Sequence, residues 1–131
     1  MDRADYDRYL TAFNTRDYDA VADLYVDPPK LSFFGVEIAS RAALKDFYTF
    51  LHAYVDEQIT LLNFASSDTL AAVEAKVRIE ARGDLTPEAL AEHGASGLFP
   101  MRAGDVIEMR QFIHYTLQDE LILSVECAML P

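Results

Sequence analysis

Residues 5–34 read DYDRYLTAFNTRDYDAVADLYVDPPKLSFF, and this stretch decides the fold. Its first half predicts an amphipathic helix over residues 5–15, because apolar side chains recur there at i, i+3, i+4 and i+7. Asp17 is placed to cap a second short helix over residues 18–25. Pro28 and Pro29 cannot continue that helix and send the chain into an extended segment.

Downstream, one more helix precedes a run of strands. Residues 31–34 predict a short strand, Gly35 marks a turn or the start of a second strand, and Ser40 is a plausible N-cap for a third helix. From residue 55 the pattern becomes strand-like. The expected strands cover residues 55–65, 70–82, 105–117 and 121–130. Helices followed by antiparallel strands are typical of the α+β class.

The segment at residues 70–82 alternates most clearly. Small and apolar side chains fall on one face, and the charged Glu74, Lys76, Arg78 and Glu80 fall on the other. One face of this strand is therefore expected in the core. The mixed-charge face suits a side of the sheet that is wet or faces a second subunit.

Residues 83–104 interrupt the run of strands. Thr86, Pro87 and Gly94 define a short helix over residues 87–93, and the remainder is irregular. Such a long connection is either a lid over a binding pocket or an inert surface insertion, and the sequence leaves both open.

Composition excludes several function classes. The 131 residues predict a single domain, 1–131, with a net charge of −11 that argues against nucleic acids and anionic membranes as partners. The chain has no apolar run long enough to span a membrane and no visible signal peptide, so we expect a cytoplasmic location. One cysteine, Cys127, and three histidines without ligand spacing predict neither a disulfide nor a metal site.

Three segments resemble a known family. They are YLTAFNTRDYDAVADLY at residues 9–25, SRAALKDFYTFL at 40–51 and FIHYTLQDELILSVECAML at 112–130. Together they are similar to the SnoaL-like polyketide cyclase family of the nuclear transport factor 2-like superfamily, which includes ketosteroid isomerase and scytalone dehydratase. The resemblance implies a cystatin-like cone, in which a curved, mainly antiparallel sheet wraps around about three N-terminal helices and encloses a mostly apolar pocket. Residues 83–104 lie outside it.

That resemblance also predicts which side chains face the pocket. Alternation agrees with it for residues 70–82, where Ala75, Val77 and Ile79 share the apolar face. The expected ligand-binding residues are Tyr9, Phe13, Tyr25, Phe33, Val77, Met109, Gln111 and Tyr115. Ile113, Val125 and Cys127 are expected to point the same way.

The sequence does not support ketosteroid isomerase chemistry when the functional positions of that enzyme are compared one by one. Tyr9 falls where that enzyme has its tyrosine, but the base position falls at or near Phe33 and the neutral acid at or near Ile113. Tyr9 is therefore either a packed core residue or a hydrogen-bond donor to a ligand carbonyl. It is one of two catalytic candidates.

His114 is the second catalytic candidate, because histidine titrates near neutral pH. Alternation places it on the face opposite the pocket, unless a one-residue bulge reverses the strand. His52 and His93 are expected to complement the C-terminal ends of their helices. The carboxylates nearest the expected pocket mouth, Asp27, Asp56 and Glu57, are expected to be solvated.

Two hypotheses remain open from the sequence. In the first, the domain binds a small hydrophobic or aromatic molecule and carries out cyclase, isomerase or dehydratase chemistry without a cofactor. In the second, it is a non-catalytic homodimeric binding or scaffold module, associated through a sheet face that includes Phe112 and His114. An ionisable side chain inside the pocket favours the enzyme.

Overall fold

The computed structural model describes residues 1–130, and in this range four helices accompany six strands. The helices are α1 (Arg3–Asn14), α2 (Tyr18–Asp23), α3 (Arg41–Tyr54) and α4 (Pro87–Glu92). The strands are β1 (Leu31–Phe33), β2 (Val36–Ile38), β3 (Val55–Ser66), β4 (Leu70–Ala81), β5 (Val106–Gln118) and β6 (Leu121–Met129). None of the helices is long and apolar enough to cross a membrane.

Local capping explains where the helices begin. The side chains of Asp17, Ser40 and Thr86 each accept a hydrogen bond from the backbone N–H three residues later, which satisfies an otherwise unpaired donor. All three caps were predicted from the sequence. Helix α1 starts earlier than expected because Asp2 and Asp5 form a reciprocal capping box.

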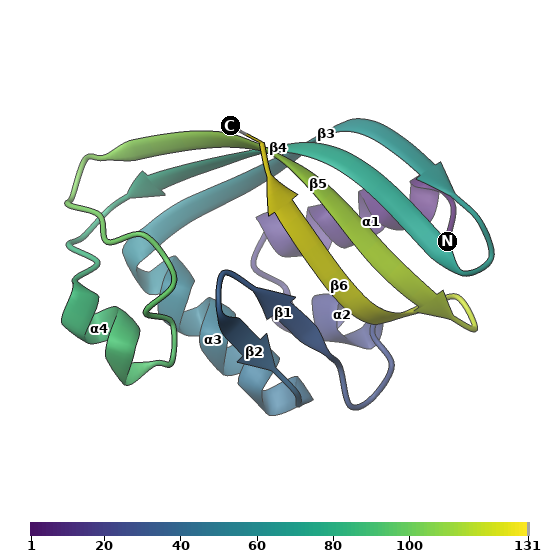
Figure 1. The fold of residues 1–131 in the computed structure, drawn as a ribbon, viewed down its shortest axis with the longest axis horizontal. Coiled ribbons are helices and arrows are strands. Elements are labelled where there is room, and N and C mark those ends of the chain that lie inside the picture. Colours follow the sequence, from purple (N-terminus) through teal and green to yellow (C-terminus); the bar gives the residue numbers. More distant parts are fainter. Residues whose placement is uncertain (131) are drawn as a thin grey trace.

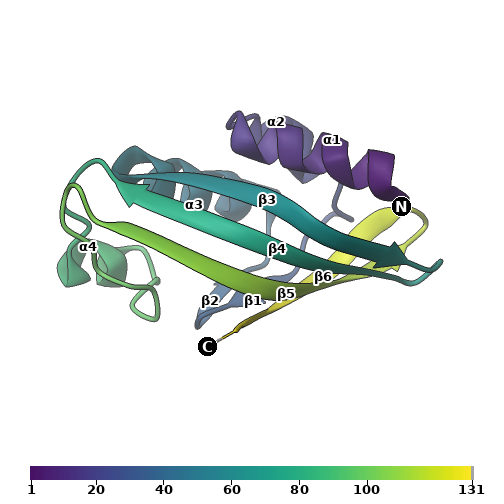
Figure 2. The ribbon, with the colours of Figure 1, turned by 90° about the horizontal axis from the view of Figure 1, so that it is seen from above.

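The strands form one sheet in the order β2-β1-β6-β5-β4-β3. Neighbouring strands are antiparallel, except for β1 and β6, which run parallel. The sheet is curved and unclosed, and Figures 1 and 2 show α1, α2 and α3 together on one side of its long strands. This is the mixed α+β arrangement that the sequence predicted.

Alternation along the long strands separates two faces. In β5, Met109, Gln111, Ile113 and Tyr115 are buried, whereas the residues between them are exposed. Ala75 and Val77 of β4 are buried in the same way, so the predicted inward set is confirmed. The outer face carries ion pairs such as Lys76–Glu108 (3.7 Å) and Arg110–Glu74 (3.2 Å).

The corner between α1 and α2 is tied to the start of β3. The Asn14 side chain donates to the Ile59 carbonyl and accepts from the Ile59 N–H, both at 3.0 Å. Arg16 has a left-handed backbone (φ 65°), and its guanidinium donates to the Glu57 carbonyl at 2.6 Å and to the Asp56 carboxylate at 2.9 Å. These contacts fix β3 relative to the helices.

The connection between β4 and β5 docks on the β1–β2 turn. Gly97 lies so close to Phe34 that a Cβ at Gly97 would be 1.9 Å from the Phe34 carbonyl oxygen. Phe34 itself is in the left-handed region (φ 48°) within the two-residue Phe34–Gly35 turn, and its ring lies 6.0 Å from that of Phe99. The segment after α4 is therefore packed against the turn.

Candidate active site

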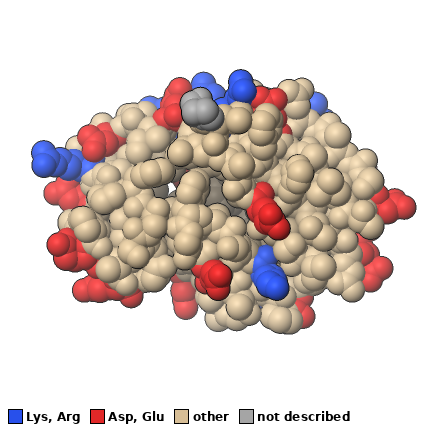
Figure 3. Space-filling view, viewed as in Figure 1, with Lys and Arg blue, Asp and Glu red and all other residues tan. Residues whose placement is uncertain are grey.

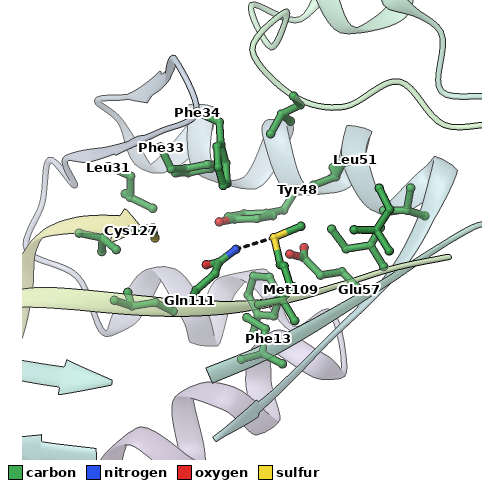
Figure 4. A pocket seen from close by; sticks show the side chains of 18 of the residues that line it. Phe13, Leu31, Phe33, Phe34, Tyr48, Leu51, Glu57, Met109, Gln111 and Cys127 are labelled. Atoms are coloured by element: carbon green, nitrogen blue, oxygen red, sulfur yellow. Dashed lines mark hydrogen bonds between the residues drawn. The ribbon is translucent and has the colours of Figure 1, made fainter. Parts of the chain in front are cut away.

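A cavity of about 110 Å³ lies between the helices and the concave face of the sheet. Strands β1, β3, β4, β5 and β6 contribute to it, together with α1, α3 and the connection between β4 and β5. The face of the molecule in Figure 3 is hollowed between the loop that follows α4 and strands β1 and β6. Figure 4 shows the side chains that surround the cavity.

All eight predicted ligand-binding residues line this cavity: Tyr9, Phe13, Tyr25, Phe33, Val77, Met109, Gln111 and Tyr115. Cys127 and Ile113 line it as well. The Gln111 amide donates to the Met109 sulfur at 3.0 Å, so its position in the cavity is held. Whether these residues contact a ligand stays a prediction.

The connection between β4 and β5 forms part of the wall. Leu85, Leu98, Phe99 and Met101 all reach the cavity. The sequence left open whether residues 83–104 are a lid or an inert insertion. Their side chains form part of the cavity wall, and a lid function stays a prediction.

Glu57 is the acidic side chain in this wall, and it is paired with a buried histidine. The Glu57 Oε1 lies 2.9 Å from His52 Nε2, and His52 Nδ1 lies 2.6 Å from the Tyr18 hydroxyl. The side chains of His52 and Glu57 are only 4% and 14% exposed. Figure 4 shows the Glu57 carboxylate beside Met109 at the cavity. A chain of three polar groups thus runs from the cavity to half-buried Tyr18.

Neighbouring residues hold this pair in place. The His52 imidazole is stacked with Tyr48 (centroids 5.5 Å apart, 23° between planes) and meets the Phe13 ring edge to face at 5.5 Å. The Arg82 guanidinium donates to the His52 carbonyl, and Arg16 donates to the Glu57 carbonyl. Both the imidazole and the backbone on either side are therefore restrained, as a preorganised acid–base pair requires.

A cluster of buried tyrosines supplies neutral hydroxyls. The Tyr9 and Tyr25 hydroxyls are 2.9 Å apart, and those of Tyr6 and Tyr115 are 2.7 Å apart. Burial raises the pKa of Tyr9 to about 12, and it raises the pKa of Tyr48 well above its usual value. These phenols stay protonated near neutral pH, so they can donate hydrogen bonds in the cavity but do not act as bases there.

The Tyr48 hydroxyl is the tyrosine group best placed to meet a ligand. Figure 4 shows Tyr48 between Phe33 and Phe34 on one side and Gln111 and Met109 on the other, with its hydroxyl toward the cavity. Within residues 1–130, that hydroxyl makes no hydrogen bond to another protein group. It is therefore free to donate to a bound molecule.

One expectation about ionisable residues was wrong and another was incomplete. His52 lies in the last turn of α3, as expected, but its ring nitrogens also contact Tyr18 and Glu57. Glu57 is not a solvated carboxylate at the mouth, because it lines the cavity. The sequence did contain a signal for the inward position of Glu57, because it lies two residues from apolar Val55 and Ile59 and therefore on the same face of the strand. Tyr48 was also missed, although it lies on the apolar stripe of α3.

The remaining candidates lie away from the cavity or, like the Cys127 thiol, stay protonated near neutral pH. His114 is exposed on the outer face of the sheet, as alternation predicted. His93 stacks on Phe50 with centroids 3.7 Å apart. Burial, with a smaller effect from the Glu57 charge, raises the pKa of the Cys127 thiol to about 11. Among residues 1–130, no group of three His, Cys, Asp or Glu side chains is arranged to hold a metal ion.

Structural comparison defines the class of protein. A candidate polyketide cyclase from Silicibacter sp. TM1040 gives a TM-score of 0.76 at 21% identity, covering 95% of this chain and 85% of that chain. Another, from Xanthomonas campestris pv. campestris, gives 0.73 at 20% identity, covering 93% and 84%. A protein with a ketosteroid isomerase-like fold from Catenulispora acidiphila, in complex with trimethylamine, gives 0.70 at 10% identity, covering 94% and 82%. At these low identities the TM-scores establish the shared fold, which is the ketosteroid isomerase-like fold of nuclear transport factor 2-like proteins.

The family follows from the sequence itself. The profile of the SnoaL-like domain matches residues 6–125, which is most of the chain. The protein belongs to the SnoaL-like domain family. No curated protein sequence matches it.

Proposed function

We propose that the cavity binds a small, largely apolar molecule and that Glu57, paired with His52, moves a proton on it without a cofactor. The observation that carries the proposal is the Glu57 carboxylate in a wall of mostly apolar and aromatic side chains, hydrogen-bonded to a buried imidazole. Carboxylates held in this way serve as general bases. Membership of the SnoaL-like family and the fold shared with candidate polyketide cyclases support it.

The proposed step needs no reactant other than the protein and the ligand, because every proton and electron pair is exchanged between them. Glu57 takes a proton from a ligand carbon, and the electron pair of that C–H bond stays on the ligand. Return of the proton to another carbon gives isomerisation. Attack of the ligand carbon on a second, electrophilic carbon, followed by protonation of the resulting oxygen, gives cyclisation. In both cases Glu57 ends as a carboxylate, and His52 keeps it oriented through the 2.9 Å contact.

Deuterium exchange tests this proposal before the natural ligand is known. Binders from a library of small apolar molecules are identified by thermal shift and then incubated with the protein in D₂O. We expect deuterium at a ligand carbon with the native protein and with Glu126→Gln, a matched change at an exposed glutamate. Glu57→Gln should lose the exchange while keeping its fold. Equal exchange by Glu57→Gln, or a screen without binders, would refute the proposal.

The outer sheet face supports a second proposal, association into a homodimer. Its charged residues already pair with one another, for example Arg78 with Glu108 at 3.8 Å, while Phe112 remains 45% exposed between them. Such a face gives a second copy apolar contact without burying unpaired charges. Sedimentation at micromolar concentration tests it, and a monomer would count against it. This association does not exclude catalysis in the cavity.

A further inference from the structure

We propose that the ligand of this cavity is a small organic cation that carries alkyl groups on its charged atom. The inference rests on the proposed function, since it assigns a chemical class to the molecule that Glu57 meets. Three observations carry it: the charge of the lining residues, the aromatic wall and the size of the cavity.

The lining residues offer negative charge and no positive charge. Among the described residues that form the wall, Glu57 is the acidic one, and there is no lysine or arginine. The two nearby guanidiniums are engaged elsewhere: Arg16 donates to a backbone carbonyl and to Asp56, and Arg82 donates to the His52 carbonyl. The Glu57 carboxylate meets His52 on one side, and a cationic ligand would give it a second, oppositely charged partner in a largely apolar space, which a neutral or anionic ligand cannot do.

Aromatic rings form much of the cavity wall to which Glu57 belongs. Phe13, Phe33, Phe34, Tyr48 and Phe99 line the cavity. The face of an aromatic ring attracts cations, most strongly where water is excluded. Alkylated ammonium groups suit such a wall best, because their methyl groups bury favourably while their charge interacts with ring faces and carboxylate.

The size of the cavity limits the ligand further. Its volume is about 110 Å³, whereas an apolar cavity of about 150 Å³ holds a benzene molecule. A tetrahedral trimethylammonium group is of this order, whereas a polycyclic molecule would require the loop carrying Phe99 to move. The volume therefore favours a compact group over an extended ring system.

The same assignment suits the proposed proton transfer. When Glu57 removes a proton from a carbon next to the charged atom, the carboxylate becomes a neutral acid and the ligand becomes a zwitterion without net charge. The carbanion then lies beside the positive charge that the ligand itself carries. Removal of a proton from a neutral ligand would instead create an anion there, with no cationic side chain in the lining to stabilise it.

A pair of nearly isosteric probes tests the inference. Choline and 3,3-dimethylbutan-1-ol have the same shape but differ in charge, and their affinities are measured by calorimetry at pH 8, above the usual titration range of histidine. We expect choline to bind the native protein at least tenfold more tightly than the neutral alcohol. Glu126→Gln should keep this ratio, and Glu57→Gln should reduce it at least fivefold.

Each alternative outcome has a distinct meaning. Equal binding of both probes to the native protein would overturn the cation assignment and leave the apolar binding site standing. Binding of neither would overturn the assignment together with the proposed function. An unchanged ratio of the two affinities in Glu57→Gln would show that Glu57 is not the source of the preference for choline. If that variant does not fold, upfield NMR shifts of the choline methyl protons with the native protein still report contact with ring faces, and their absence counts against the proposal.

Discussion

Substituting Gly97 by alanine tests whether the segment after α4 is docked on the β1–β2 turn. The new Cβ would lie 1.9 Å from the Phe34 carbonyl oxygen and 2.9 Å from the carbonyl carbon. Ordinary contact requires about 3.5 Å, so the two backbones must separate by roughly 1.5 Å. Overpacking of this kind costs about 1–3 kcal/mol. Separation also removes Leu98 and Phe99 from the cavity wall.

Gly83→Ala is the matched control. A Cβ there would meet only the Tyr54 ring at 3.9 Å, which is ordinary contact. Both substitutions reduce the conformational freedom of the unfolded chain, which stabilises by about 0.4–1 kcal/mol. This gain is common to both variants and cancels, so we expect the free energy of unfolding in urea to be about 1–3 kcal/mol lower for Gly97→Ala than for Gly83→Ala. Equal stability of the two variants would show that the segment is not docked on the turn.

Three further predictions concern the turn, the helix corner and alkaline pH. Phe34→Asn should change the free energy of unfolding by no more than about 1 kcal/mol, because the preference of asparagine for the left-handed turn offsets the lost ring contacts. A loss above about 3 kcal/mol, measured by urea denaturation, would contradict this expectation. Asn14→Ala should cost about 2 kcal/mol, since it unpairs the N–H and carbonyl of Ile59, whereas Asn63→Ala, which loses an exposed contact, should cost much less. The Cys127 pKa of about 11 exceeds that of an unfolded thiol. The contribution of this thiol to the free energy of unfolding is therefore present below about pH 8.5 and is lost, by about 2–3 kcal/mol, as the pH rises towards 11. Cys127→Ala should weaken that decline in urea titrations at pH 8 and pH 10.5.

The fold was predictable because its signals are local. The caps at Asp17, Ser40 and Thr86 depend on a side chain and a backbone group three residues apart, and the sequence places them correctly. Strand alternation likewise identified the buried face of β4, whereas the buried face of β5, including Gln111, was predicted from the family resemblance. Within residues 1–130, the elements themselves therefore follow from short-range patterns.

The acid–base pair was not predictable in the same way. His52 ends a helix and Glu57 begins a strand, so no single periodicity relates them. Their contact depends on how the chain bends between α3 and β3, and on Arg16 and Arg82, which are distant in sequence and hold the backbone on either side. Glu57 was expected to be solvated, although it alternates with inward-facing Val55 and Ile59, and only the packed structure brings His52 beside it.

The tyrosine cluster has a practical consequence for detecting ligands. The chain contains seven tyrosines and no tryptophan, so its intrinsic fluorescence comes from tyrosine alone. Four of the seven, Tyr9, Tyr25, Tyr48 and Tyr115, line the cavity. A molecule that enters it changes the surroundings of most of the emitting rings at once. Changes in tyrosine fluorescence therefore test the proposed ligand binding without a label.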